Sequence, residues 1–546
     1  MPNFFPRLNI RLAFLLLAAC TLACPVLVAQ ALGTHTLLVM PFENHSKAPG
    51  IEWIGEAFPE VLSQRMASQQ IYVISREDRV YAFDHAGIPG AAHPSRATTY
   101  AVAEQMDADY VVFGDYDFDG KTFTAKAQLL DMKKLRLAAM VQSSGPLTSL
   151  IDVQTDLAWQ LLNQLPTPPA VTRAQFLQSS KPIRLDAFEN YIRGVLATNR
   201  QQKTKYFREA IRLNPNYTLA MLQLGRLYYD GHEYESAALW LAKIPKDDVM
   251  AGEANFLLGM AEFYRGNYDK ADAAFSFLAA RLPLTEVYNN LGVVEGRRGR
   301  RSASIDHFTK AVTADPSDPD YRFNLAVALY KNGDNAGAAQ QLREELQRRP
   351  NDGEAKNLLE NINRGIYAPT IPAPGAQVLG IPPGTSQVRV PLERIKRNYD
   401  EASYRQLEVE IHNLTEERLA KSDRKSHSAY HSDRGKDLLA RGLTAEAQAE
   451  FREAISLDYN NAAAHAGMAR AMEQTGDTFN ARSEAQTSVR LQPNADAYLV
   501  LARLNLKQNQ LDAASDAVKS ALKLEPGNSA AQGLQRDVTA KQTAPH

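Results

Sequence analysis

The sequence has only two cysteines among its 546 residues, Cys20 and Cys24, and both lie inside its first apolar stretch. If that stretch is removed, the rest of the chain has no thiol, which excludes disulfides, cysteine metal ligands and cysteine nucleophiles together. The chain also lacks an excess of charge of either sign, because 61 basic and 62 acidic side chains leave a formal net charge of −1. Proteins that bind nucleic acid usually carry a basic excess or a concentrated basic stripe, so we expect no nucleic-acid partner.

Recognisable catalytic motifs are missing as well. The sequence contains no GxSxG nucleophile elbow, no HExxH metal motif and no paired-carboxylate pattern. His427 and His431 lie four residues apart and can share a helix face, which is the spacing of a metal-binding pair. No third ligand is evident near them, and their polar surroundings favour a solvated helix start. We therefore predict that the protein is not an enzyme and that it carries no cofactor and no metal.

The amino-terminal segment has the pattern of an export signal. Arg7 and Arg11 flank the start of an uncharged, apolar run over residues 12–32, which ends near the small residues Ala-Gln-Ala at 29–31. Positive charge followed by an apolar core and small residues is typical of a secretory signal peptide. We therefore expect residues 1–31 to be a signal peptide.

Two other interpretations of this segment stay open. The apolar run is about 21 residues long, which is enough to cross a bilayer as an uncleaved membrane anchor. The residues Leu-Ala-Ala-Cys at 17–20 also resemble a bacterial lipobox, which would place a lipid on Cys20. All three interpretations place the residues beyond 33 outside the cytoplasm, in the periplasm or the cell envelope.

Residues 34–166 alternate between strand and helix patterns. Short apolar runs at 35–42, 71–74 and 110–113 indicate buried strands, and apolar residues at helical spacing over 51–69 indicate a helix between the first two. Antiparallel hairpins and a last helix complete the region. The pattern predicts a small α/β domain with a mixed sheet and helices packed on it.

The order of short motifs in this domain resembles a known family. LLVMPFENHS, YVISREDR and AEQMDADYVVFGDYDFDGKTFTAKAQLLD follow one another as in TolB-amino-terminal-like domains. The same fold family includes domains of the curli secretion protein CsgG and the flagellar outer-membrane protein FlgO. The resemblance implies an envelope-associated interaction domain without catalytic residues.

An internal repeat of 34 residues is the strongest pattern in the sequence. Each unit has small residues at positions 8 and 20, a large residue at 24 and often a proline at 32. The unit that starts at residue 285 supplies these as Gly292, Ser304, Phe308 and Pro316. Small residues let two antiparallel helices approach closely, and the proline ends the second helix. The pattern is similar to that of the tetratricopeptide repeat (TPR), and it predicts one array over 184–365 and a second over 428–541.

The two arrays are separated by a segment of different composition. Residues 366–391 contain six prolines, which predicts an extended linker. Residues 392–422 return to helical periodicity, and we expect an amphipathic helix there that docks on the second array. A coiled-coil arm is an alternative that the sequence leaves open.

In the TPR family, a few positions of the first helix of each hairpin face a concave groove. In the first array these positions hold mainly aromatic, methionine and basic side chains, which are enriched in interface cores. The predicted groove residues are Arg226, Tyr229, Phe256, Met260, Phe263, Tyr264, Arg297, Phe323, Tyr330 and Lys331. We expect an extended or helical peptide as the ligand, although several of these side chains could instead complete the packing between hairpins.

The sequence thus predicts a multidomain protein, in which a small α/β domain with a mixed sheet precedes an all-α TPR solenoid in two arrays. The expected function is that of a non-catalytic protein–protein interaction scaffold of the bacterial cell envelope. Its expected partners are other proteins or peptide segments, and also the membrane through the amino terminus. Two alternatives stay open: a lipoprotein or anchored subunit of an outer-membrane secretion or assembly machine, and a sensor whose α/β domain binds a small ligand.

Overall fold

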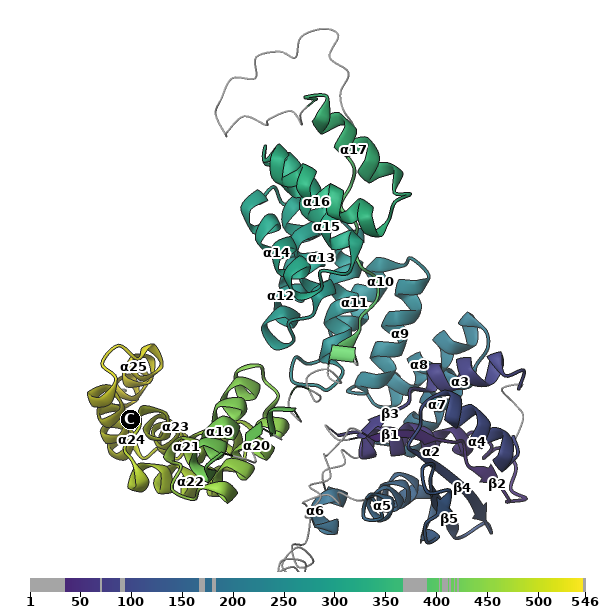
Figure 1. The fold of residues 1–546 in the computed structure, drawn as a ribbon. Helices are drawn as coiled ribbons and strands as arrows, with labels where there is room; N and C mark the ends of the chain where they lie inside the picture. The colour runs from purple at the N-terminus through teal and green to yellow at the C-terminus, as the bar shows by residue number, and fades with distance from the viewer. Residues whose placement is uncertain are drawn as a thin grey trace, which may run out of the picture.

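The structure is a computed structural model, which shows a small α/β domain followed by two arrays of helical hairpins (Figure 1). It describes residues 35–68, 71–88, 94–165, 172–178, 183–366, 390–401, 403–404, 411, 414–416, 418–419 and 422–543. The predicted signal segment, with Cys20, and most of the proline-rich linker lie outside the described residues. Within the described residues, no helix combines the length and the apolar character needed to cross a membrane.

The α/β domain contains one mixed sheet, as the sequence predicts. Its strands are β1 (His35–Val39), β2 (Glu43–Asn44), β3 (Ile71–Val73), β4 (Tyr110–Phe118), β5 (Phe123–Asp131), β6 (Arg136–Leu137) and β7 (Val141–Gly145). The order is β3-β1-β4-β5-β6, with β2 beside β4 and β7 beside β5. Strand β1 is parallel to both of its neighbours, whereas β5 is antiparallel to β4, β6 and β7.

Helices cover both faces of this sheet because successive residues of a strand point to opposite sides. Leu37 and Val39 of β1 face α2 and α5, whereas Leu38 faces α3 and α4. These helices, with the short ones that follow the sheet, are α2 (Ile54–Met66), α3 (Arg76–His85), α4 (Arg96–Gln105), η1 (Leu147–Ser149), α5 (Leu150–Leu162) and α6 (Arg173–Gln178). The ring of Phe42 lies over Gly114, where an added Cβ would come within 2.1 Å of it.

The first array consists of antiparallel helical hairpins that follow one another in sequence order (Figure 1). Its helices are α7 (Leu185–Leu196), α8 (Arg200–Leu213), α9 (Thr218–Asp230), α10 (Tyr234–Leu241), α11 (Ala251–Tyr264), α12 (Tyr268–Arg281), α13 (Thr285–Arg297), α14 (Arg301–Ala314), α15 (Pro319–Lys331), α16 (Asn335–Arg348) and α17 (Gly353–Asn363). The second array has the same construction. Its helices are α19 (Arg424–Ala440), α20 (Thr444–Leu457), α21 (Ala462–Gln474), α22 (Thr478–Leu491), α23 (Ala495–Lys507), α24 (Leu511–Leu524) and α25 (Ser529–Thr543).

The close approach of paired helices explains the repeat pattern. A Cβ added at Gly292 would come within 2.6 Å of the ring of Phe308, and one added at Gly259 within 2.7 Å of Phe275. The glycine therefore leaves the space that the phenylalanine of the partner helix fills. Contacts as short as these would force the ring or the helix to move, so position 8 accepts only very small side chains opposite phenylalanine.

The α/β domain and the first array share one continuous hydrophobic core. Trp53 packs edge-to-face against Phe188 of α7, with ring centroids 5.9 Å apart. The hydroxyl of Tyr191 donates a hydrogen bond of 3.0 Å to Glu60 of α2, and burial raises the pKa of the Glu60 carboxyl. The two parts are therefore packed as one unit, with apolar and polar contacts between them.

The helix predicted over residues 392–422 is wrong in its first part. Residues 391–400 contain no helix, and they lie in the groove of the first array instead of on the second array. The described residues between 401 and 419 are helical. The later part of the segment does contact the second array, because Glu416 bonds to His427 of α19.

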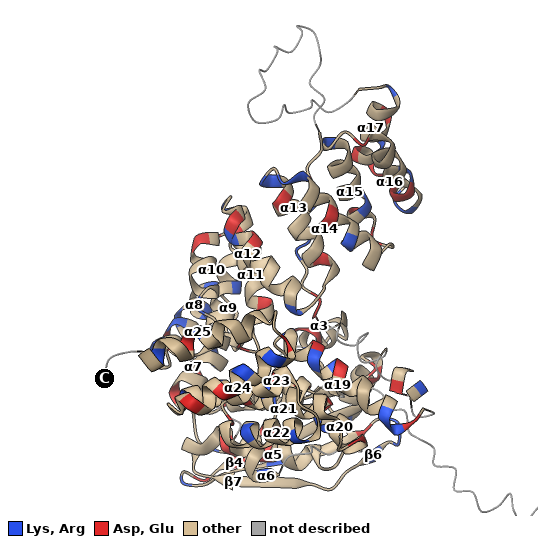
Figure 2. Ribbon diagram, turned by 90° about the vertical axis from the view of Figure 1, so that its left-hand side faces the viewer, with Lys and Arg blue, Asp and Glu red and all other residues tan. Residues whose placement is uncertain are grey.

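Charged side chains of both signs are interspersed along the ribbon (Figure 2). In the view of Figure 2, red and blue positions are intermingled on the helices, and both arrays carry both signs.

Candidate functional site: a peptide-binding groove

Residues 390–401, with 403 and 404, cross the first helices of the hairpins in the first array. The segment contacts α17 and α15 first, then α13, and finally α11, so that it runs against the direction of the array. Figure 1 shows it as a green trace that descends beside α13 and α11. We call these residues the groove segment. Its position is that of a peptide ligand, supplied here by the same chain.

Three asparagines bind the backbone of the groove segment. Asn290 accepts a hydrogen bond from the N–H of Lys396 and donates one to its carbonyl, both at 2.8 Å. Asn324 does the same with Arg394, at 2.6 and 2.7 Å. Asn289 adds a bond of 2.9 Å to the Arg394 carbonyl and accepts one of 2.7 Å from Asn324. Because both backbone groups of alternate residues are bonded, the asparagines act as a neighbouring β-strand would.

An acidic wall faces the basic side chains of the segment. Arg394 forms ion pairs with Asp320 at 3.0 Å and with Asp352 at 2.7 Å. Lys396 contacts Asp318 at 2.6 Å and Asp320 at 2.9 Å. Burial alone would raise the pKa of Asp320, but hydrogen bonds from Lys396, Arg349 and Arg394 lower it to about 2. The carboxylate of Asp320 is therefore ionised at neutral pH.

The other side of the segment faces a mixed basic and apolar surface. The buried carboxylate of Glu393 pairs with Lys331 and lies 3.6 Å from Arg297. Ile395 packs on the apolar cluster of α11 and α13. Glu393 and Ile395 therefore face away from the acidic wall, as expected when successive side chains of an extended chain alternate between two sides.

Aromatic contacts hold the far end of the segment. The ring of Tyr399 lies 5.2 Å from that of Phe256. Arg397 lies over the ring of Tyr264 and donates a hydrogen bond of 3.0 Å to its hydroxyl. The backbone N–H of Asp400 donates to Glu286 at 3.0 Å. The end of the groove segment near α11 is therefore held by ring contacts and by one further hydrogen bond from its backbone.

Half of the predicted groove residues contact the segment directly. Phe256, Tyr264, Arg297 and Lys331 do so as described above, and the guanidinium of Arg394 lies 3.6 Å from the ring centre of Phe323. The structure therefore brings these five side chains together along one ligand.

The other predicted groove residues have different partners. Arg226 pairs with Glu253, and Tyr229 packs against Tyr234 and Tyr264. Met260 and Phe263 belong to the apolar clusters between hairpins, as the alternative packing role predicts. Tyr330 is buried, and its hydroxyl bonds to the carbonyl of Ile366.

Sequence reasoning missed the residues that matter most for backbone binding. Asn290 and Asn324 are 34 residues apart, so they occupy the same position, the sixth, in consecutive repeats. The positions transferred from the family did not include the sixth. The sequence did offer a signal, since asparagine recurs at the sixth position of consecutive first helices. A buried amide side chain needs hydrogen-bond partners, so this recurrence could have indicated a binding role.

The α/β domain also contains a cavity of about 430 Å³. It lies beside the end of β1 and the middle of β4, and side chains of α3 and α4 line it, among them Arg79, Arg96 and Thr99. Arg79 is already engaged, because it pairs with Glu56 and donates to the Val39 carbonyl. Arg96 lies near the ring of Phe113.

Comparison with protein families identifies the repeats. The family model described as "Tetratricopeptide repeat" matches residues 256–319, 289–353, 432–495 and 467–529. The matches fall in both arrays, so both carry tetratricopeptide repeats. A comparison with curated proteins gives no significant match.

Similar solved structures include other repeat proteins. A tetratricopeptide repeat protein from Parabacteroides merdae is 12% identical with a TM-score of 0.24, over 59% of this chain and 98% of that one. YrrB, described as a TPR protein with an unusual peptide-binding site, is 16% identical with a TM-score of 0.29, over 33% of this chain and 90% of that one. The C-terminal domain of LpoB from Salmonella enterica is 14% identical with a TM-score of 0.19, over 21% of this chain and 84% of that one. At such TM-scores these likenesses say nothing about function.

Proposed function

We propose that the protein is a non-catalytic protein–protein interaction scaffold of the bacterial cell envelope, whose first array binds an extended segment of a partner protein. The occupied groove is the observation that carries this proposal. Asn290 and Asn324 bond to backbone groups that any extended peptide offers, so the groove has the chemistry of a general peptide receptor. The envelope location rests on the export pattern of residues 1–31 and on the resemblance of the α/β domain.

The groove segment also indicates which partner sequences fit. Glu393, Arg394, Ile395 and Lys396 present an acidic, a basic, an apolar and a basic side chain in turn, each with a matching surface. A partner segment of this pattern would compete with the groove segment for the same contacts. The groove is then closed in the free protein and opens to a partner that displaces its own chain.

Cross-linking in intact cells tests the proposal. A tagged chain should capture envelope proteins, and changing Asp318 and Asp320 to lysine should lower their yield by about tenfold or more. The reason is that hydrogen bonds to charged groups contribute about 1.5–3 kcal/mol, and 1.4 kcal/mol corresponds to a factor of about ten. The captured proteins are identified and quantified by mass spectrometry.

The matched control changes Asp512 and Asp516 to lysine, which alters two exposed acidic residues of α24 in the second array. This variant should capture the same proteins as the wild type. Capture of cytoplasmic proteins alone would contradict the envelope location. Equal capture by the Asp318/Asp320 variant would contradict the role of the groove.

The cavity in the α/β domain favours a second function, that of a small-ligand sensor. We expect a ligand with an anionic group to bind near Arg96 and to raise the unfolding midpoint of the intact chain by a few degrees, because a ligand that binds only the folded state stabilises it. Thermal unfolding across a set of small carboxylates and phosphates measures this. The shift should vanish in Arg96→Ala and persist in Arg136→Ala, whose side chain is exposed elsewhere. If none of these compounds raised the unfolding midpoint, the sensor function would be contradicted.

A further inference from the structure

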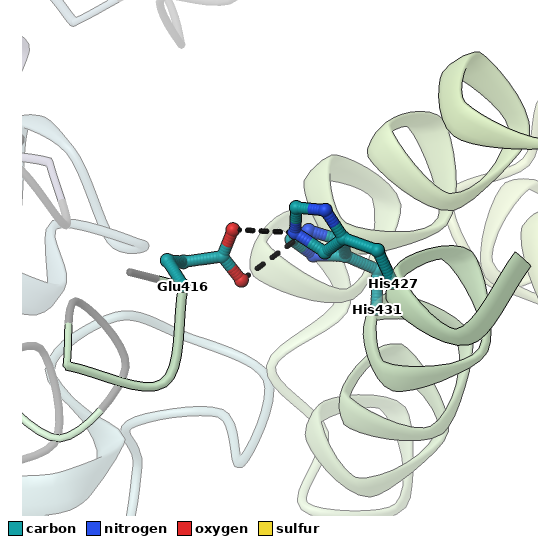
Figure 3. Close-up of side chains that lie close together, drawn as sticks. All are labelled: Glu416, His427 and His431. Carbon is teal, nitrogen blue, oxygen red and sulfur yellow. Dashed lines mark hydrogen bonds and ion pairs between the residues drawn. The ribbon is translucent and has the colours of Figure 1, made fainter. Parts of the chain in front are cut away.

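Two histidines of α19 and one glutamate of the preceding segment converge at the start of the second array (Figure 3). His427 and His431 lie one helical turn apart, and their rings are stacked with centroids 5.0 Å apart. One carboxylate oxygen of Glu416 lies 2.7 Å from Nε2 of His427, and the other lies 3.4 Å from Nε2 of His431. One ligand atom from each of the three residues lies within 4.8 Å of the others.

A buried carboxylate orients the deeper histidine from behind. Nδ1 of His431 lies 2.7 Å from Glu450, whose other oxygen accepts a hydrogen bond of 2.9 Å from Arg434. With Nδ1 of His431 next to Glu450, Nε2 on the other side of the ring faces Glu416. A carboxylate behind the ring is the usual support for a histidine that binds a metal ion.

The next repeat offers an internal comparison. His465 occupies the same repeat position as His431, and its Nδ1 likewise lies next to a carboxylate, that of Glu484. Its Nε2, however, lies 2.9 Å from the carbonyl of Tyr459. The histidine–glutamate pair is thus a feature of the repeat. Of these two units, only the one with His431 also brings a second histidine and a second carboxylate next to that pair.

The three side chains present their ligand atoms to one another. Glu416 contributes a carboxylate oxygen, and each histidine contributes Nε2. A single divalent ion placed among these atoms would be bonded by all three residues.

We propose that Glu416, His427 and His431 bind a divalent transition-metal ion such as Zn²⁺. Two imidazole nitrogens and one carboxylate oxygen suit zinc, with bonds of about 2.0–2.2 Å and a water in the fourth position. Calcium and magnesium are disfavoured because they require mainly oxygen ligands. The ion would tie the segment around Glu416 to α19, and so fix the connection between the groove segment and the second array.

The test is a zinc titration of the intact chain, purified without a polyhistidine tag and stripped with a chelator. A competing chromophoric chelator reports the free zinc. We expect one equivalent of Zn²⁺ to bind the wild type, and at least about tenfold weaker binding in His427→Ala and in Glu416→Gln. Glu450→Gln, which alters only the support, should weaken binding by about 10- to 100-fold.

His465→Ala is the matched control, since it removes a histidine with the same carboxylate partner from the next repeat, and it should bind zinc like the wild type. Circular dichroism confirms that each variant keeps its helices. Absence of a stoichiometric site in the wild type would overturn the proposal. So would equal affinity in the wild type, His427→Ala and Glu416→Gln, because another site would then hold the ion.

Discussion

Changing Asn290 and Asn324 to alanine together should release the groove segment and make it at least about 30-fold more sensitive to trypsin. The two amides make four hydrogen bonds to the backbone of Arg394 and Lys396. At about 0.5–1.5 kcal/mol for each net bond, their loss costs about 2–6 kcal/mol of docking free energy. Each 1.4 kcal/mol is a factor of about ten in the docking equilibrium. Cleavage after Arg394, Lys396 and Arg397, followed by mass spectrometry, reports the undocked fraction when opening and closing are fast.

Asn255→Ala provides the control for this experiment. Asn255 is also a buried asparagine on a first helix of the array, but its side chain donates to the carbonyl of Ala251 in its own helix and, within the described residues, to no backbone group of the groove segment. Its replacement should leave the cleavage rate in the groove segment close to that of the wild type. If the double variant were cleaved no faster than Asn255→Ala, the asparagines would not hold the segment in solution.

The repeat register could be predicted from the sequence because its cause is local. The contact between Gly292 and Phe308 joins residues 16 positions apart within one hairpin, and the same contact recurs between Gly259 and Phe275. Each unit therefore shows the same residue types at the same spacing. The mixed sheet was predictable for a similar reason, since each buried strand forms its own apolar run.

The groove segment could not be predicted because its spacing fits two structures. Ile395 and Tyr399 are four residues apart, which places them on one face of a helix and also on one side of an extended chain. Both in fact contact the apolar cluster of α11 and α13. The choice between the two structures depends on Asn290 and Asn324, which lie more than 65 residues earlier and satisfy the backbone groups that a helix would otherwise bond.

The candidate metal ligands show a related limit. The spacing of His427 and His431 was visible in the sequence, but Glu416 lies 11 residues before the first of them. Nothing in its spacing marks it as a ligand, and only the folded structure shows that its carboxylate lies next to the two histidines (Figure 3). Glu450 comes from the partner helix of the hairpin, α20, and is likewise placed by packing.

Changing Arg394 and Lys396 to glutamate within the chain should make a labelled peptide of residues 390–401 bind at least about 100-fold more tightly. In the wild type the peptide must displace a segment of its own sequence, which the tether holds near the groove at an effective concentration on the order of millimolar. The measured dissociation constant is then the intrinsic constant divided by the small fraction of open grooves. Charge reversal places two carboxylates against Asp318, Asp320 and Asp352, so the tethered segment leaves. Fluorescence anisotropy with the intact chain measures the affinity.

Two further variants separate an open groove from a nonspecific effect of charge. Lys519→Glu with Lys523→Glu reverses two exposed charges on α24 and should leave the peptide affinity at the wild-type value. Adding Asp320→Lys to the opened chain should abolish most of the gain, because the free peptide needs the same acidic wall for its own Arg394 and Lys396. If the wild type and the opened chain bound the peptide equally, the groove would be empty in solution. The proposed competition between partner and groove segment would then be wrong.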